Sequence, residues 1–204
     1  MSIIKKIIYA VLNLIFPRQC VLCGATGAYL CGACLREKKY GGDAVHKLIE
    51  LLKYKFSAEI AEILGRILYE RYAGFLARAG RDLKCAGQEN NWAIAFVPIH
   101  KKRFLFRGFN HAEKISRTVA DLSGVPISDC LIKIRNTHPQ VGLKRSERLT
   151  NLIDAFALRP GAAVAKNIIL IDDVRTTGAT LAECVKVLKK AGAVKIYEMV
   201  LRCG

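Results

Sequence analysis

The stretch from Ile169 to Thr180 reads ILIDDVRTTGAT and combines an aliphatic run, two adjacent carboxylates, two threonines and a glycine. The aliphatic run predicts a buried strand, and the pattern from Gly178 to Lys190 predicts a helix. Carboxylates at the carboxyl end of a strand lie where open α/β sheets bind ligands, and the start of a helix attracts anions. A sugar phosphate satisfies both features, so the stretch predicts a site for a ribose 5-phosphate group.

In this site the candidate catalytic residues Asp172 and Asp173 accept hydrogen bonds from ribose hydroxyls, directly or through a magnesium shell. The phosphate is expected on the loop and helix start that follow, at Thr176, Thr177, Gly178, Ala179 and Thr180. The order of residues matches neither a Walker loop nor a G-x-G-x-x-G dinucleotide loop. The alternative is that the acids only cap the helix, but two adjacent carboxylates repel each other and a cap does not need both.

Four of the eight cysteines lie close together in the segment CVLCGATGAYLCGAC. They form two C-x-x-C pairs separated by seven residues, and the four are Cys20, Cys23, Cys31 and Cys34. Two such pairs can supply the four thiolates of one tetrahedral zinc, which leaves no position for water and therefore predicts a structural metal. A redox pair or disulfides are the alternatives, because the usual spacing between such pairs is about fifteen to twenty residues.

Helices and strands alternate along the rest of the chain. The periodicity predicts helices over 43–79, interrupted near Phe56 and Ser57, and over 110–122 and 178–190. Strands are expected at 92–99, 131–134, 155–158, 167–171 and 194–201. This alternation predicts right-handed crossovers and an α/β fold, with a mostly parallel sheet covered by helices on both faces.

The chain divides by composition into two parts. Residues 1–40 hold an apolar segment and the cysteine cluster, and residues 41–204 hold a helical lead-in at 43–80 and a sheet core at 91–204, with a weak boundary at 80–91. The opening MSIIKKIIYAVLNLIFP predicts an amphipathic helix docked on the protein, with contact to a membrane surface as the alternative. It is too short to span a bilayer and lacks a cleavage site, so we expect a cytoplasmic protein with no stable membrane insertion and with reduced thiols.

Charge narrows the range of partners. The chain has 33 Lys and Arg against 17 Asp and Glu, a formal net charge of +16, which favours phosphate-bearing partners: nucleotides, sugar phosphates, nucleic acid or an anionic membrane. The alternative is that excess lysine only keeps the protein soluble. With 204 residues and 52% hydrophobic content, the chain can bury a core as one main domain with a small appendage, which excludes a disordered chain.

The basic residues gather in one region. Between Ile99 and Asn151 there are eleven Lys and Arg against four Asp and Glu, in segments that read mainly as loops. Within it, KKRFLFRGFNH interleaves cations with Phe104, Phe106 and Phe109, a combination that single-strand binders use. For each phenylalanine a place in the core is the favoured interpretation over stacking, and a solvated charged face is the alternative for the cations.

The motif ILIDDVRTTGATL resembles the phosphoribosyl-pyrophosphate loop of the type I phosphoribosyltransferases, and nearly the whole chain is similar to the ComF family of competence-associated proteins. The segments that carry the resemblance are FPRQCVLCG, LKYKF, VPIHKKRFLFRGFN and RNTHPQVGLKRSERLTNLIDAF. Two features depart from the family pattern. The stretch between the cysteine cluster and Tyr40 is shorter than the family often shows, and His111 stands where glutamine is expected.

The resemblance implies a type I phosphoribosyltransferase-like fold with an N-terminal zinc ribbon. It implies that Asp172 and Asp173 hold the ribose and its magnesium, above a 5′-phosphate cradle. Residues expected to contact pyrophosphate or a DNA backbone are Lys101, Lys102, Arg103 and Arg107. Residues expected in a hood over the site are Arg135, Gln140, Arg148 and Asn151.

The implied ligands are phosphoribosyl pyrophosphate or a nucleotide with magnesium, and the implied partners are single-stranded DNA and proteins of the competence machinery. The implied function is the handling of single-stranded DNA during natural competence. The alternative is an active phosphoribosyltransferase in nucleotide metabolism or salvage, whose acceptor the residues do not name. Glutamine-dependent amination is poorly supported, because Cys20 belongs to the metal cluster and no Cys-led glutamine-hydrolysing half is present.

Overall fold

The computed structural model describes residues 17–37, 40–55, 57–85, 91–137 and 152–204. At its centre four parallel strands pair in the order β2-β1-β5-β6. These strands are β1 (Trp92–Phe96), β2 (Ile127–Ser128), β5 (Asn167–Arg175) and β6 (Lys195–Cys203). The strand order reverses direction between β1 and β5, and such a switch point opens a crevice at the carboxyl ends of the strands.

Alternate side chains of the central strands enter two cores. Ile94, Ile169 and Ile171 pack with residues of α3 (Gly42–Lys55), α4 (Ala58–Arg71) and α7 (His111–Ser123). Ala95, Ile168 and Leu170 pack on the other face with α9 (Ala179–Lys190). Because strand side chains alternate between faces, a continuous apolar run fills both cores, and the predicted α/β architecture is confirmed.

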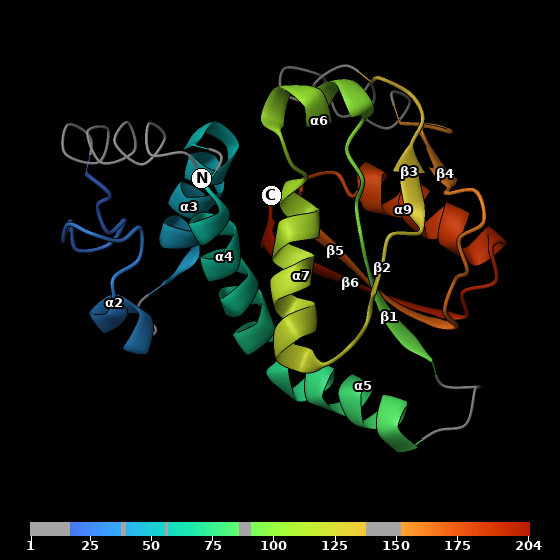
Figure 1. The fold of residues 1–204 in the computed structure, drawn as a ribbon, viewed down its shortest axis with the longest axis horizontal. Helices are drawn as coiled ribbons and strands as arrows, with labels where there is room; N and C mark the ends of the chain where they lie inside the picture. Colours follow the sequence, from blue (N-terminus) through green and yellow to red (C-terminus); the bar gives the residue numbers. More distant parts are fainter. Residues whose placement is uncertain (1–16, 38–39, 56, 86–90, 138–151) are drawn as a thin grey trace, which may run out of the picture.

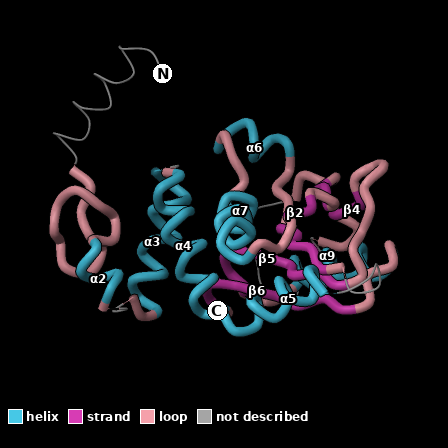
Figure 2. The backbone as a smooth tube through the Cα atoms, turned by 60° about the horizontal axis from the view of Figure 1, so that its bottom comes forward, coloured by secondary structure: helices cyan, strands magenta, loops and turns pink. Residues whose placement is uncertain are grey.

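The helices of the first core lie side by side as α3, α4 and α7 (Figures 1 and 2), and α5 (Ala73–Cys85) packs against α7 and β1. Gly65 allows the close approach of α4 and α7, since a Cβ at this position would lie 2.5 Å from Cβ of Thr118. The side chain of Arg71 ties α4 to the sheet by donating to the carbonyl of Leu201 at 2.7 Å.

Two further strands form a separate antiparallel pair, β3 (Leu131–Lys133) with β4 (Phe156–Leu158). β4 contacts α9, and Figure 1 shows the pair beside α9 with the short helix α6 (Lys101–Arg107) nearby. The pair therefore lies next to the carboxyl edge of the main sheet, where the resemblance implies a hood.

Several predicted boundaries are wrong. β5 continues four residues beyond its predicted end at Ile171, because β6 keeps pairing with it as far as Arg175 and Cys203. Strand β2 was not predicted, and α5 runs to Cys85 across the expected boundary.

Residues 101–107 form the helix α6 rather than a loop. The side chain of His100 accepts a hydrogen bond from the N–H of Lys102 at its start, and Gly108 ends it at φ 78°. No residue of α6 is buried, so an apolar periodicity that could have revealed the helix is absent from this segment.

The cysteine-rich segment precedes α3 and contains the short helix α2 (Gly32–Arg36). Cys20 and Leu30 belong to the same buried cluster as Leu48 of α3, and Arg18 forms an ion pair with Glu59 of α4 at 2.6 Å. Among the described residues, the helices are too short or too polar to cross a bilayer. The amphipathic helix predicted for the first residues lies outside the described part of the chain.

Candidate functional site

The paired acids lie at the carboxyl edge of the sheet. β1 ends opposite Ile171, so Asp172 and Asp173 extend β5 just past the end of its neighbour. The N–H of Asp173 donates to Oδ1 of Asp172 at 2.9 Å, and the N–H of Val174 donates to Oδ1 of Asp173 at 2.8 Å. One oxygen of each carboxylate is thereby held by the backbone.

The electrostatics of this pair favour a cation. Burial and the neighbouring charge of Asp173 raise the pKa of Asp172 well above its ordinary value, and Lys133 acts in the opposite direction. A carboxylate with a raised pKa gains stability when a positive charge approaches it. Carboxylate oxygens are also ligands that magnesium prefers, so the donor set fits this ion.

The loop after β5 forms the start of α9. Gly178 precedes the helix at φ 77°, a left-handed conformation that glycine adopts without steric cost. The hydroxyl of Thr177 accepts a weak hydrogen bond of 3.4 Å from the N–H of Ala179. The first turn of α9 holds no acidic residue, so no carboxylate side chain of the turn itself opposes an anion at the positive end of this helix. All five residues of the predicted cradle lie in this loop and first turn: Thr176, Thr177, Gly178, Ala179 and Thr180.

The basic residues expected near the ligand lie on α6. Lys101 and Lys102 are exposed, and Arg103 and Arg107 are half-buried. Burial and the charge of Arg107 lower the pKa of Arg103 from its ordinary value. An anion that neutralised this pair would relieve the repulsion between them.

The phenylalanines of this region do not share one environment. Phe104 is 44% exposed and Phe106 is 83% exposed, so a place in the core is wrong for both. Phe109 is partly buried against the first core, as expected. The two exposed rings stand on a helix whose polar residues are all cationic, an arrangement that suits a nucleic-acid strand.

A cavity of about 540 Å³ lies between α6, the end of β1 and β3. Its lining includes Phe96, Lys101, Phe104, Leu131 and Lys133. This volume is within the range of small-molecule sites.

Lys133 lines this cavity and was not among the residues predicted from the sequence. Its Nζ lies 5.1 Å from the centre of the Phe156 ring, and burial together with the charge of Arg103 lowers its pKa to about 8. Asp172 is the nearby acid that acts in the opposite direction. A lysine inside a short apolar strand was the only signal of this role in the sequence.

His111 is the second residue whose place the sequence left open. It is 5% exposed at the first position of α7, and its Nε2 has no hydrogen-bond partner among the described residues. Burial and the charge of Arg107 lower its pKa to about 4, and Asp173 acts against this shift.

The hood is described only in part. Arg135 is exposed and donates to the carbonyl of Ile153. Gln140, Arg148 and Asn151 lie outside the described residues.

The four cysteines form a cluster suited to a metal ion. One sulfur from each lies within 4.8 Å of the others. A tetrahedral zinc with bonds of about 2.3 Å needs sulfurs about 3.8 Å apart, so the cluster fits this ion with little movement. All seven cysteines whose side chains the structure describes are free thiols.

The four thiols lie close enough to change one another's pKa values. Although burial acts in the opposite direction, backbone N–H groups of Cys23 and Cys31 lower the pKa of Cys20 to about 6. The side chain of Cys31 and burial raise the pKa of Cys34 to about 12. Several thiolates cannot coexist at this spacing without a cation, and a bound metal supplies one.

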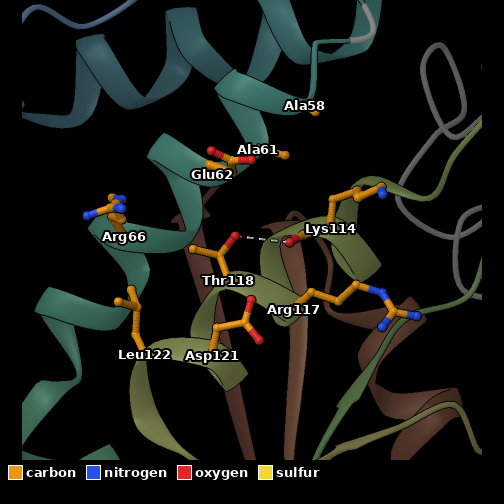
Figure 3. Close-up of a pocket in the computed structure, with 9 residues that line it drawn as sticks. All are labelled: Ala58, Ala61, Glu62, Arg66, Lys114, Arg117, Thr118, Asp121 and Leu122. Atoms are coloured by element: carbon orange, nitrogen blue, oxygen red, sulfur yellow. Dashed lines mark hydrogen bonds between the residues drawn. The ribbon is translucent and has the colours of Figure 1, made fainter. Parts of the chain in front are cut away.

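A second cavity, of about 300 Å³, lies between α4 and α7 (Figure 3). Its lining includes Glu62, Arg66, Lys114 and Asp121, and the hydroxyl of Thr118 donates to the carbonyl of Lys114 at 3.4 Å. None of the residues predicted from the sequence to form a site lines this cavity, so it is separate from the carboxyl edge of the sheet.

Comparison with solved structures finds phosphoribosyltransferases. The orotate phosphoribosyltransferase from Aeropyrum pernix is 17% identical with a TM-score of 0.41, over 95% of this chain and 80% of that one. The hypoxanthine-guanine phosphoribosyltransferase of L. donovani is 15% identical with a TM-score of 0.39, over 71% and 72% of the two chains.

Comparison with curated sequences identifies the family, although no family model matches the chain. The DNA utilization protein YhgH of Escherichia coli K12 is 29% identical over 87% of this chain and 80% of its own. Competence protein ComFC of Streptococcus pneumoniae is 31% identical over 72% of this chain and 60% of its own. Competence protein F of Haemophilus influenzae is 32% identical over 89% of this chain and 82% of its own. Similarity of this extent, together with the paired acids, the cysteine cluster and the parallel sheet, shows that the chain belongs to the ComF family of competence proteins.

Proposed function

We propose that this protein binds phosphoribosyl pyrophosphate or a nucleoside monophosphate with magnesium at the carboxyl edge of β5, and that it handles single-stranded DNA during natural competence. The proposed binding of a magnesium-bound sugar phosphate rests on one observation: the acid pair and the start of α9 lie close together along the chain. Asp172 and Asp173 favour a cation, and the start of α9, which follows after a short loop, favours an anion. A magnesium-bound sugar phosphate supplies both charges.

Each part of the ligand has a matching group. The hydroxyls of the ribose can donate hydrogen bonds to the carboxylate oxygens of Asp172 and Asp173 that the backbone does not hold. The 5′-phosphate accepts hydrogen bonds from N–H groups between Thr176 and Thr180. The pyrophosphate lies toward the cations of α6, which follows the neighbouring strand β1. Magnesium, when bound, neutralises part of the charge on the phosphates and the acids.

The second part rests on α6 and on the relatives. The exposed rings of Phe104 and Phe106 can stack on bases while the cations of α6 contact phosphates. The names of the relatives, competence protein and DNA utilization protein, agree with a role in DNA handling. Proteins of the competence machinery are then the expected partners, and the cytoplasm the expected compartment.

We further propose that the cysteine cluster holds a structural zinc. Cys20 and Cys34 lie in the same buried cluster as residues of α3 and α4, so a metal at this point would brace the N-terminal segment against the rest of the protein. Four sulfur ligands leave no open position for catalysis.

An active phosphoribosyltransferase is the second candidate, favoured by the cavity beside Lys133. The cavity is lined by Lys133 and by residues of α6 and α7, and its volume of about 540 Å³ leaves room for a small-molecule acceptor. In such a reaction the acceptor attacks the anomeric carbon, pyrophosphate leaves, and the carboxylates stabilise the positive charge that develops on the sugar.

Calorimetry with phosphoribosyl pyrophosphate and with a nucleoside monophosphate, each with and without magnesium, tests the proposal. Saturable binding that weakens without magnesium is expected. An absence of binding to both ligands would contradict the phosphoribosyl part. Release of pyrophosphate with one of a panel of bases and amines would select the transferase, and binding without release across the panel would favour a sensor or structural site.

A further inference from the structure

His111 is a buried polar side chain without a known task. It is 5% exposed, and its Nε2 makes no hydrogen bond among the described residues. An unsatisfied buried nitrogen costs about 1–3 kcal/mol, and a functional role such as contact with a ligand is one explanation for such a group in a folded protein. The ring of Phe109, 5.2 Å away between centres, packs against the imidazole but provides no acceptor.

The position of His111 is set by its neighbour. The amide of Asn110 donates to the carbonyl of Val97 at 2.9 Å, and its oxygen accepts from the N–H of Ala112 at 3.1 Å. These two bonds hold the start of α7 against the end of β1, at the crevice between β1 and β5. They also occupy the side chain of Asn110, whereas the Nε2 atom of His111, at the same helix start, has no hydrogen-bond partner among the described residues.

The surroundings of His111 select an anion as the missing partner. The charged groups that act on the imidazole are Arg107 of α6, Lys53 of α3 and Asp173 of β5. The imidazole is therefore subject to two cations, the positive end of a 13-residue helix and one acid. That acid, Asp173, is a proposed ligand of magnesium. Burial and the charge of Arg107 lower the pKa of His111 to about 4, so the imidazole is neutral at pH 7 and carries one N–H, which in the Nε2–H tautomer can donate to an acceptor.

We propose that His111 is a phosphate-binding residue, whose Nε2–H donates a hydrogen bond to an oxygen of the pyrophosphate group when the ligand is bound between β1, α6 and α7. This inference rests on the proposed function, because it concerns the same ligand. The 5′-phosphate and the ribose bind at β5 and α9, on the other side of the crevice. His111 therefore distinguishes ligands that carry a pyrophosphate from ligands that do not.

Glutamine at this position would also present an N–H at a similar distance from the backbone, whereas leucine fills the buried space without a donor. The test measures the affinity of wild type, His111→Gln and His111→Leu for phosphoribosyl pyrophosphate and for ribose 5-phosphate, with magnesium, by calorimetry. We expect His111→Leu to bind phosphoribosyl pyrophosphate about 10- to 100-fold more weakly, the effect of one hydrogen bond to a charged group. We expect His111→Gln to stay within about three-fold of wild type, and ribose 5-phosphate to bind all three proteins equally.

The comparison between the two ligands separates binding from folding. If His111→Leu lost affinity for both ligands alike, the residue would support the structure and the inference would be overturned. If His111→Leu bound phosphoribosyl pyrophosphate as wild type does, the inference would fail while the proposed function remained. Failure of the wild type to bind either ligand would overturn both.

Discussion

The backbone N–H of Asp173 donates to Oδ1 of Asp172 at 2.9 Å, so the first acid of the pair fixes the peptide that carries the second. An asparagine can keep an oxygen in the same place, but it removes the negative charge and replaces the second oxygen with an NH₂ donor. We therefore expect Asp172→Asn and Asp173→Asn each to weaken the magnesium-dependent binding of phosphoribosyl pyrophosphate by about 1.5–3 kcal/mol. Calorimetry measures this, with Asp121→Asn on the exposed side of α7 as the control. Unchanged affinity in both variants would remove the acids from the site.

The same substitution at Asp172 is expected to stabilise the fold. Burial and Asp173 raise the pKa of Asp172 in the folded protein above its unfolded value, so the charged form opposes folding. The folded state takes up the proton at a higher pH than the unfolded state, and this cost is therefore full above the folded pKa and declines as the pH falls through it. In magnesium-free buffer, urea unfolding should give Asp172→Asn a higher free energy of unfolding than wild type at pH 8. The difference between the two proteins should be smaller at pH 5. A lower stability of the variant at pH 8 would contradict this electrostatic interpretation.

The cysteine cluster predicts one zinc per chain. Cys23→Ser removes one of four sulfur ligands that lie within 4.8 Å, so metal content should fall and the N-terminal segment should become sensitive to proteases. Cys203→Ser, an exposed thiol outside the cluster, is the matched control. Elemental analysis of the purified proteins measures the zinc content per chain. Full zinc content in Cys23→Ser would exclude this ligand set.

The exposed face of α6 predicts two separable contributions to DNA binding. The affinity for single strands should fall with salt, and replacing Arg103 and Arg107 by alanine should reduce the slope of log affinity against log salt by about 1.4, or about 0.7 for each lost phosphate contact. Phe106→Ala should lower the affinity by about 1–3 kcal/mol and leave the slope unchanged, because stacking releases no counterions.

Fluorescence anisotropy with a labelled oligonucleotide over a range of salt measures both effects. The control replaces Lys189 and Lys190, which are exposed at the end of α9. If that variant flattened the slope as much as the arginine variant does, the binding would reflect net charge rather than a surface on α6.

Two glycines in helices predict opposite effects of the same substitution. A Cβ at Gly65 would lie 2.5 Å from Cβ of Thr118 and 3.0 Å from the carbonyl oxygen of Ile115, so Gly65→Ala should destabilise the protein by about 1–3 kcal/mol. A Cβ at the exposed Gly74 of α5 meets nothing within 4 Å, so Gly74→Ala should stabilise it by up to about 1 kcal/mol. Chemical unfolding measures the change in the free energy of unfolding for each of the two variants. Equal effects would show that α4 and α7 are not packed this closely.

The sequence by itself determined the features whose parts lie close together along the chain. The acids and the phosphate loop fall within twelve residues, from Ile169 to Thr180, and the four cysteines fall within the fifteen residues from Cys20 to Cys34. In both cases a strand, a turn and a helix start are enough to bring the groups together. The parallel α/β fold was likewise predictable, because periodicity and crossover handedness depend on local patterns.

Only the tertiary structure decided what surrounds these groups. The length of β5 depends on its pairing with β6, and the exposure of Phe104 and Phe106 depends on what α6 packs against. Lys133 comes near Asp172 through a different sheet, and His111 comes near Asp173 through a helix on the opposite side of the crevice. Burial and electrostatic neighbours arise from segments far apart in the chain, and local spacing carries no information about them.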